Sequence, residues 1–297
     1  MRVNPNFTPT ILTDLWQQQA QEQTAIQQLA TGRRVNVPSD DPSAAAADVQ
    51  NQSQQSQIDQ YLQNTNTLEG MLQTADSTLG SVVTALNQAI SLGVQGSNGD
   101  LSSSNRQEIA QQMQSLQSQI VQLANASYQG NYLFGGTATQ SAPFALDPAQ
   151  PSGVRYNGNS SVNSVQIAQG RSIQTNLPGS QIFQGAGGDV LGALQQLVTA
   201  LQSGTSTSIS AATTQLGTAL SYVSQQRVFY GSAVSQLNAN QTDLQQEKVS
   251  LQTEDTNLVG ADMATAATEL SRAKTAQDAT LAALAQIIPQ SLLNYLK

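Results

Sequence analysis

The chain of 297 residues carries 19 acidic and 11 basic side chains, a net charge of −8, and only 4 % of its residues are aromatic. It has no cysteine and no histidine, which excludes disulfides, the usual zinc sites and any mechanism that needs an imidazole base. No Lys- or Arg-rich block is present, so binding to nucleic acid or to anionic membranes is disfavoured. With few aromatic residues, burial has to come from Leu, Ile, Val and Ala along elongated surfaces.

The first half of the chain shows three stretches with helical spacing of apolar residues. The first runs from about Thr10 to Ala30. In the other two, over residues 68–89 and 109–123, apolar residues recur at alternating spacings of four and three. In the first stretch, four apolar residues predict one packing seam with a polar middle: Leu12, Leu15, Ile26 and Leu29.

Residues 132–188 differ in character, because Gly, Pro, Asn and Ser become dense. The segments SVQIA (164–168) and SIQTN (172–176), joined through a glycine, predict a β-hairpin. The segment GAGGDVLG (185–192) lacks the third glycine and the βαβ context of a dinucleotide-binding loop, and we expect a flexible linker there.

The second half returns to helical spacing. A 4-3 rhythm runs without a break from Ile209 to Leu258, which predicts one long rod-like helix with several polar seam positions. A last helix is expected over about 261–288, where Pro289 should limit it, and the tail QSLLNYLK can resume as one more amphipathic turn.

These elements predict a mainly α protein, an elongated bundle of long coiled-coil-like helices with paired N- and C-terminal helices and a small β-rich insertion. We expect three parts. Residues 1–45 with 259–297 form a terminal helical domain, 46–131 with 189–258 a long-helix bundle, and 132–188 an outer β-rich domain.

The stretch RRVNVPSDDPSAAAA (33–47) is predicted to be a joint between two helices. Gly32 suits a helix end, and Asp41 followed by Pro42 suits a helix start. The basic pair Arg33 and Arg34 is expected at the negative end of the preceding helix. An acid–base or metal role for the two aspartates is disfavoured, and no catalytic residue, cofactor or metal is expected.

The same joint resembles the N-terminal signature of the bacterial flagellin family, which includes the hook-associated proteins of the hook–filament junction. The signature residues are Arg33, Arg34, Asn36, Pro38, Asp40, Asp41 and Pro42. The C-terminal segment from LVGADMATAATELSRAK onward resembles the other end of that family. The turn PSDDPSAAAA, the start MRV and the segment GNYLFGGTATQSAPF (130–144) are more similar to the junction proteins than to flagellins.

The resemblance implies a structural adaptor that joins hook to filament and is required for filament growth. Its expected partners are identical subunits in a ring, a neighbouring hook-associated protein, flagellin on the distal side and an export chaperone. It implies an extracellular location reached by type III export, and we find no cleaved signal peptide pattern. Ten residues of the terminal helices would serve assembly: Leu12, Leu15, Trp16, Ile26, Leu29, Leu270, Leu281, Leu284, Ile288 and Leu292.

Two alternatives stay open at the level of sequence. One is a small flagellin that forms the filament itself. The other is an unrelated secreted coiled-coil binding protein.

Overall fold

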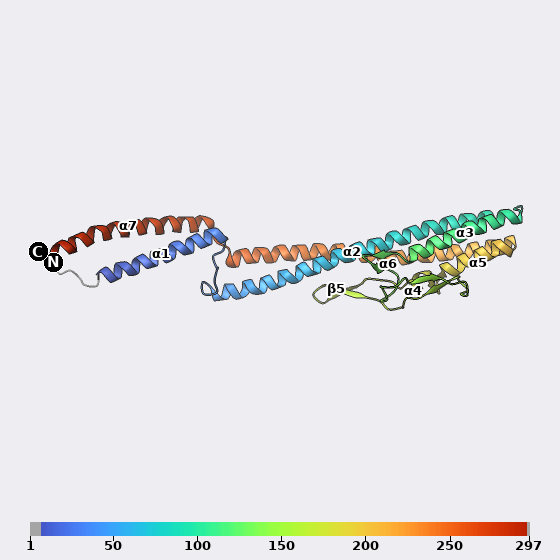
Figure 1. The fold of residues 1–297 in the computed structure, drawn as a ribbon, viewed down its shortest axis with the longest axis horizontal. Coiled ribbons are helices and arrows are strands. Elements are labelled where there is room, and N and C mark those ends of the chain that lie inside the picture. Colours follow the sequence, from blue (N-terminus) through green and yellow to red (C-terminus); the bar gives the residue numbers. More distant parts are fainter. Residues whose placement is uncertain (1–6, 296–297) are drawn as a thin grey trace. The chain divides into compact units, whose positions relative to one another are not determined.

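The computed structural model describes residues 7–295, and it describes side-chain burial for residues 12–285. Long helices dominate this part of the chain (Figure 1). The helices are α1 Phe7–Thr31, α2 Pro42–Gly96, α3 Ser103–Ala124, α4 Gly179–Phe183, α5 Val190–Ser203, α6 Ser206–Val259 and α7 Met263–Tyr295.

Short antiparallel hairpins lie between α3 and α5. They pair β1 Ser127–Tyr128 with β2 Asn131–Tyr132, β3 Phe144–Leu146 with β4 Val154–Tyr156, β5 Ser164–Ala168 with β6 Arg171–Gln174, and β7 Gln184–Gly185 with β8 Gly188–Asp189. The predicted mainly α fold with a small β-rich insertion is confirmed.

The chain divides into two compact units. Unit 1 joins the two ends of the chain, Met1–Gln57 and Gln246–Lys297, and unit 2 is the continuous segment Ile58–Gln245. The three-part division drawn from the sequence stays a prediction.

The core of unit 2 lies where the apolar seams of its helices meet. The 4-3 spacing places a Leu, Ile, Val or Met on one face of each helix, and burying each contributes roughly 1.5–3 kcal/mol. The largest side chains buried there are Leu72, Leu79, Leu86, Met113, Ile120, Leu191, Leu194 and Tyr230. The long helix predicted over 209–258 is confirmed as α6.

Arg227 and Tyr230 in α6 take packing and register positions, as their seam spacing indicates. The Arg227 guanidinium donates two hydrogen bonds of 2.9 Å to the carboxylate of Asp76 in α2. Tyr230 is buried, and its hydroxyl accepts a hydrogen bond from the Leu177 N–H (3.4 Å).

The β insertion adds a group of aromatic rings to the same core. The ring of Phe183 meets Phe134 and Phe144 edge-to-face at 5.5 and 5.3 Å between centroids. Asn240 of α6 donates from Nδ2 to the Ile167 carbonyl (2.8 Å), which ties the β5–β6 hairpin to the helix. That hairpin is confirmed, with Gly170 at φ +70° in its turn.

The flexible linker expected before a helix at Leu191 is wrong, although that helix is found as α5, which begins at Val190. Gly185 and Gly188 pair in the β7–β8 hairpin, and Asp189 caps α5 by accepting the Gly192 N–H (2.8 Å). The glycines serve close approach and not flexibility. A Cβ at Gly187 would lie 2.6 Å from the ring of Tyr222.

The helix end expected before Pro289 is also wrong, because α7 continues through it to Tyr295. A proline removes one backbone hydrogen bond and disfavours the turn before it, but it does not forbid the helix from continuing.

Candidate functional site

The joint between α1 and α2 forms as its residues predict. Gly32 adopts φ +69°, and its N–H donates to the Gln28 carbonyl (2.8 Å), which closes the last turn of α1. Asp41 then begins α2 by accepting the N–H of Ala44 (3.1 Å), with Pro42 at the first helical position.

A second joint, between α6 and α7, is bound directly to the first. The Arg34 N–H donates to the Val259 carbonyl (2.7 Å), and the Ala261 N–H donates to the Gly32 carbonyl (2.9 Å). Arg33 and Gly260 face each other across this antiparallel bridge. Residues more than 220 positions apart in the sequence therefore form one double joint, and all of them belong to unit 1.

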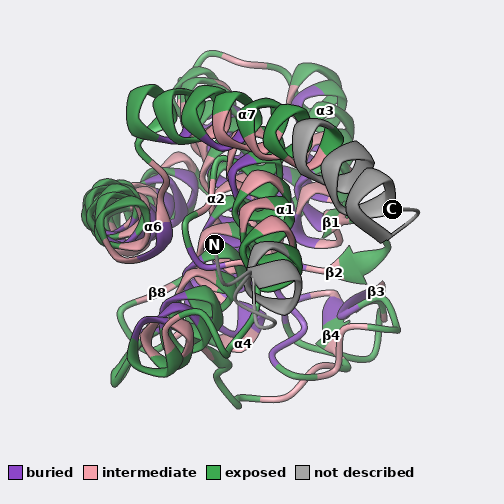
Figure 2. Ribbon diagram, turned by 90° about the vertical axis from the view of Figure 1, so that its left-hand side faces the viewer, coloured by how far each residue is buried: buried purple, intermediate pink, exposed green. Residues whose placement is uncertain are grey.

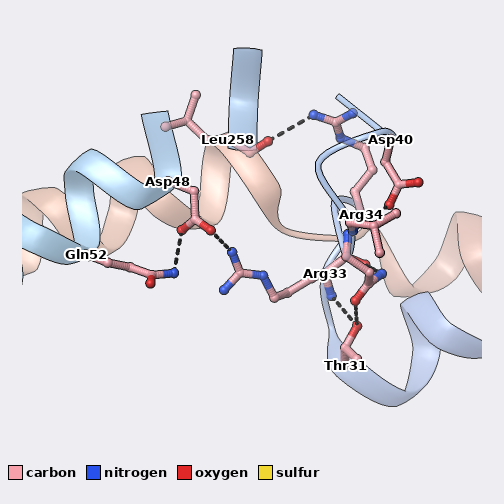
Figure 3. Close-up of polar contacts among 9 residues, drawn as sticks. Thr31, Arg33, Arg34, Asp40, Asp48, Gln52 and Leu258 are labelled. Carbon is pink, nitrogen blue, oxygen red and sulfur yellow. Dashed lines mark hydrogen bonds and ion pairs between the residues drawn. The ribbon is translucent and has the colours of Figure 1, made fainter. Parts of the chain in front are cut away.

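The Arg34 guanidinium connects both halves of the double joint (Figure 3). It donates to the carboxylate of Asp41 (3.1 Å) and to the Leu258 carbonyl at the end of α6 (2.9 Å). Arg34 follows the end of α1 as predicted, but the helix carbonyl that its guanidinium meets belongs to α6. A negative helix end attracts the guanidinium as predicted, but through tertiary structure.

Asp41 is held in its charged form by its neighbours. Besides the Ala44 N–H, its carboxylate accepts a hydrogen bond from the Ser43 hydroxyl (2.8 Å). Together with the guanidinium of Arg34, these donors lower the pKa of Asp41 to about 2.

Asn36 and Asp40 satisfy the backbone of the loop between the helices. The Asp40 carboxylate accepts the N–H groups of Val37 and Asn36, each at 3.0 Å, and these donors lower its pKa. The Asn36 amide donates to the Arg33 carbonyl (2.8 Å). Pro38 lies exposed in the same loop. The seven signature residues are thus brought together as a structural joint.

The double joint also contains a pair of carboxyls, Asp48 and Asp255, that the sequence reasoning missed. Arg33 forms an ion pair with Asp48 of α2, and Gln52 Nε2 donates to the same carboxylate (3.0 Å, Figure 3). Burial favours protonation of Asp48, but its hydrogen bond with Asp255 of α6, Gln52 and the Arg33 charge outweigh this and lower its pKa. The same hydrogen bond, followed by burial, raises the pKa of Asp255. The two carboxyls therefore share one proton more readily than they carry two charges.

The helix start expected near residue 261 is found at Met263, but the residue that caps it was missed. Asp262 caps this helix by accepting the N–H of Ala264 (2.9 Å), and it binds the Thr265 hydroxyl (2.9 Å). The signal was present in the sequence, since an aspartate stands directly before a strongly helix-forming stretch.

This arrangement holds two chain joints together and offers no catalytic constellation. Among the described residues, no cluster of acidic side chains could hold a metal ion. Two asparagines that begin Asn-x-Ser sequences make structural hydrogen bonds: Asn125 exchanges two hydrogen bonds with the Phe144 backbone (2.8 and 2.9 Å), and Asn159 is bound to Thr137. In the part of the chain that the structure describes, no helix is long and apolar enough to span a membrane.

Gly32→Ala is expected to lower the free energy of unfolding by about 1–2 kcal/mol. A Cβ at Gly32 would meet nothing within 4 Å, so the cost comes from the positive φ alone. Gly217→Ala is the control, because it also has open space but lies inside α6, where alanine should stabilise by about 0.5–1 kcal/mol. Equal effects of the two substitutions in thermal unfolding would contradict the backbone argument.

Helices α1 and α7 pack on each other within unit 1, as the predicted pairing of the terminal helices requires. Ala25, Ala266 and Ala273 are buried at this contact, and the Thr280 hydroxyl donates to Gln18 Oε1 (3.2 Å). Figure 2 shows most of the described part of α7 as exposed. Small and polar side chains dominate the seam, so the pair buries little apolar surface.

The predicted seam residues of α1 differ in exposure. Leu15 and Leu29 are half-buried, whereas Leu12 and Ile26 are 45 % and 48 % exposed. Trp16 is 67 % exposed. The packing predicted for this seam, within and between subunits, stays a prediction.

In α7, Leu270 and Leu284 are half-buried, and Leu281 is 47 % exposed. The side chains of Ile288 and Leu292 lie outside the described residues. The role of all these residues in assembly stays a prediction.

Comparison with known proteins agrees with this geometry at both ends of the chain. Residues 7–139 match the family model of the bacterial flagellin N-terminal helical region, and residues 213–296 match that of the C-terminal helical region. The chain belongs to the bacterial flagellin family. This family consists of structural components of the flagellum and not of enzymes, and the resemblance seen in the sequence is confirmed.

Within the family, relatives of two kinds are found. Flagellar hook-associated protein 3 of Salmonella typhimurium is 34 % identical over 158 residues, which cover 53 % of this chain and 48 % of that protein. The chain spans about half the length of the two hook-associated relatives of this kind that it matches. The flagellin of Listeria innocua is 25 % identical over 289 residues, which cover 96 % of this chain and 95 % of the flagellin.

Solved structures show the same fold. A putative flagellar hook-associated protein from Vibrio parahaemolyticus aligns with a TM-score of 0.68 and 22 % identity over 74 % of this chain and 100 % of its own. FlgL of Xanthomonas campestris aligns with a TM-score of 0.61 and 19 % identity over 68 % of this chain and 98 % of its own.

Proposed function

We propose that this flagellin-family chain is an adaptor subunit of the hook–filament junction, required for filament growth. The observation that carries the proposal is the double joint of unit 1, whose two chain crossings are tied by backbone hydrogen bonds. Such a joint fixes the positions at which the chain passes from α1 to α2 and from α6 to α7. A subunit needs these positions fixed if its neighbours are to bind it in one orientation. The similarity to hook-associated protein 3 supports the junction over other places in the flagellum.

The outward face of α1 supports assembly with other subunits. Leu12, Trp16 and Ile26 recur at helical spacing on one stripe and stay largely exposed, while α7 occupies the neighbouring face. Covering one such side chain contributes roughly 1.5–3 kcal/mol. The partners we propose are identical subunits in a ring, a hook-associated protein on the hook side and flagellin on the distal side. An export chaperone would bind the C-terminal segment before assembly.

The location proposed with this function is the extracellular flagellum, reached through the type III export channel without a cleaved signal peptide. An unfolded route through a narrow channel suits a chain without disulfides, because no covalent cross-link has to open or close.

Deleting the coding region tests the proposal. We expect bare hooks by electron microscopy and flagellin shed into the medium by immunoblot, with both defects reversed by the wild-type gene. Loss of the major filament protein itself, or intact motile flagella, would contradict the junction role.

Complementation with a Leu12→Gln, Trp16→Gln double variant tests the α1 stripe. We expect the variant to be exported and to keep wild-type thermal stability, because both side chains are exposed, yet to leave hooks bare. A Gln17→Ala, Gln21→Ala variant on another exposed part of α1 is the matched control and should restore filaments. Full complementation by the Leu12→Gln, Trp16→Gln variant would show that this stripe of α1 is not needed for assembly.

A small flagellin is the second candidate, favoured by the Listeria match over 96 % of this chain. Quantitative mass spectrometry of sheared flagella separates the two, since a junction subunit is a minor component and a flagellin the major one. Membership of the flagellin family excludes the unrelated secreted coiled-coil protein.

A further inference from the structure

The chain contains two Asn-Gly pairs, Asn98–Gly99 and Asn157–Gly158. In such a pair the backbone nitrogen of glycine can attack the side-chain amide of asparagine, because glycine has no side chain to block the approach and rotates freely. The reaction requires a backbone free to turn and a side chain folded over the next peptide. The structure gives the two pairs opposite surroundings.

Asn98 and Gly99 lie exposed in the loop between α2 and α3. A Cβ at Gly99 would meet nothing within 4 Å, and in this described loop its N–H donates no hydrogen bond. The Asp100 N–H donates to Asn98 Oδ1 (3.3 Å). This contact folds the side chain over the Gly99 peptide and polarises the amide carbonyl.

Asn157 is held away from the corresponding geometry. Its Oδ1 accepts a hydrogen bond from Arg155 Nε (2.9 Å), which draws the side chain back along β4. Its own N–H is bound to the Pro143 carbonyl (2.7 Å). A Cβ at Gly158 would lie 2.4 Å from the Tyr156 hydroxyl, so this glycine is packed and cannot rotate freely.

We propose that Asn98 is a site of spontaneous deamidation in the folded protein, and that Asn157 is protected from it. The Gly99 nitrogen forms a bond to Asn98 Cγ and loses its proton to water, while the side-chain nitrogen leaves as ammonia. The product is a five-membered succinimide. One water molecule then opens either of its carbonyls and yields aspartate or isoaspartate, without any oxidation or reduction.

The modification changes the loop in two ways. A carboxylate replaces a neutral amide two residues from Asp100, so two negative charges stand close together at the tip between α2 and α3. The isoaspartate product also adds a backbone atom between Asn98 and Gly99. This lengthening disturbs the turn in which the Leu101 N–H donates to the Asn98 carbonyl (3.3 Å).

Incubation of the purified full-length protein at mildly alkaline pH, followed by protease digestion and mass spectrometry, tests the site. In the native protein we expect the aspartate and isoaspartate products at residue 98 to accumulate several-fold faster than those at residue 157. The same chain in urea is the internal control, where both Asn-Gly pairs should convert at similar rates.

Gly99→Ala is the matched variant, because it fits the open loop, keeps Asn98 and crowds the attacking nitrogen. It should slow conversion at residue 98 several-fold and leave thermal unfolding unchanged. Equal rates at the two pairs in the native protein would overturn the proposal. So would native conversion at neither pair over a period in which both convert in urea.

Discussion

Phe183→Ala is expected to lower the free energy of unfolding of unit 2 by about 3–5 kcal/mol. The ring is fully buried at the end of α4 and meets Phe134 and Phe144 edge-to-face. Truncation would remove these contacts and leave a cavity. The surroundings are closely packed, since a Cβ added at Gly179 would lie 2.7 Å from Phe144. Urea unfolding followed by circular dichroism measures the loss.

Leu146→Ala is the control for this measurement. Leu146 belongs to the same β insertion but is 61 % exposed, so its truncation should change stability by no more than about 0.5 kcal/mol. If Phe183→Ala lowered the free energy of unfolding by no more than this, the aromatic cluster would not be what stabilises the insertion.

Asp255→Asn is expected to stabilise unit 1 at neutral pH by about 1–2 kcal/mol, and to bring no gain in acid. Because the pKa of Asp255 is raised in the fold, the stability that its proton provides is complete below the ordinary value of 3.8 and is lost as the pH rises through the raised pKa. Asparagine keeps an N–H donor toward Asp48 at every pH. Since the pKa of Asp48 is lowered, its charge stabilises the fold above 3.8 and stops doing so as the pH falls below that value.

Thermal midpoints of wild type and variant, measured from acid to neutral pH, check this expectation. The gap between them should open as the pH rises through the Asp255 pKa. Glu254→Gln removes the same charge from the adjacent exposed position and should show no such gap. A gap of constant size at all pH values would mean that the two carboxyls do not share a proton.

The helices were predictable because their signals are local. The 4-3 rhythm placed α6 within three residues of its bounds, and the sequence around Gly32, Asp41 and Pro42 placed the joint. Each of these residues acts on its own neighbours through backbone conformation or capping, so no knowledge of distant segments was required.

The errors arise where a residue's partner is far away in the sequence. Arg34 meets the end of a helix that lies 224 positions further along the chain. The sequence of the β7–β8 hairpin predicts flexible glycines. Their real role is not visible there, because only the tertiary structure brings Tyr222 against them. The Asp48–Asp255 pair was missed for the same reason.

Unit 1 is built from the two ends of the chain, and this affects the order in which the protein folds. Unit 2 is one continuous segment, whereas unit 1 closes only when the backbone near Gly32 meets that near Ala261. Contacts of such high sequence separation form slowly, since a long loop must first be closed at an entropic cost. A chain that is synthesised from its N-terminus can therefore fold unit 2 first. Its first helix, α1, completes unit 1 only after the C-terminal segment has been made.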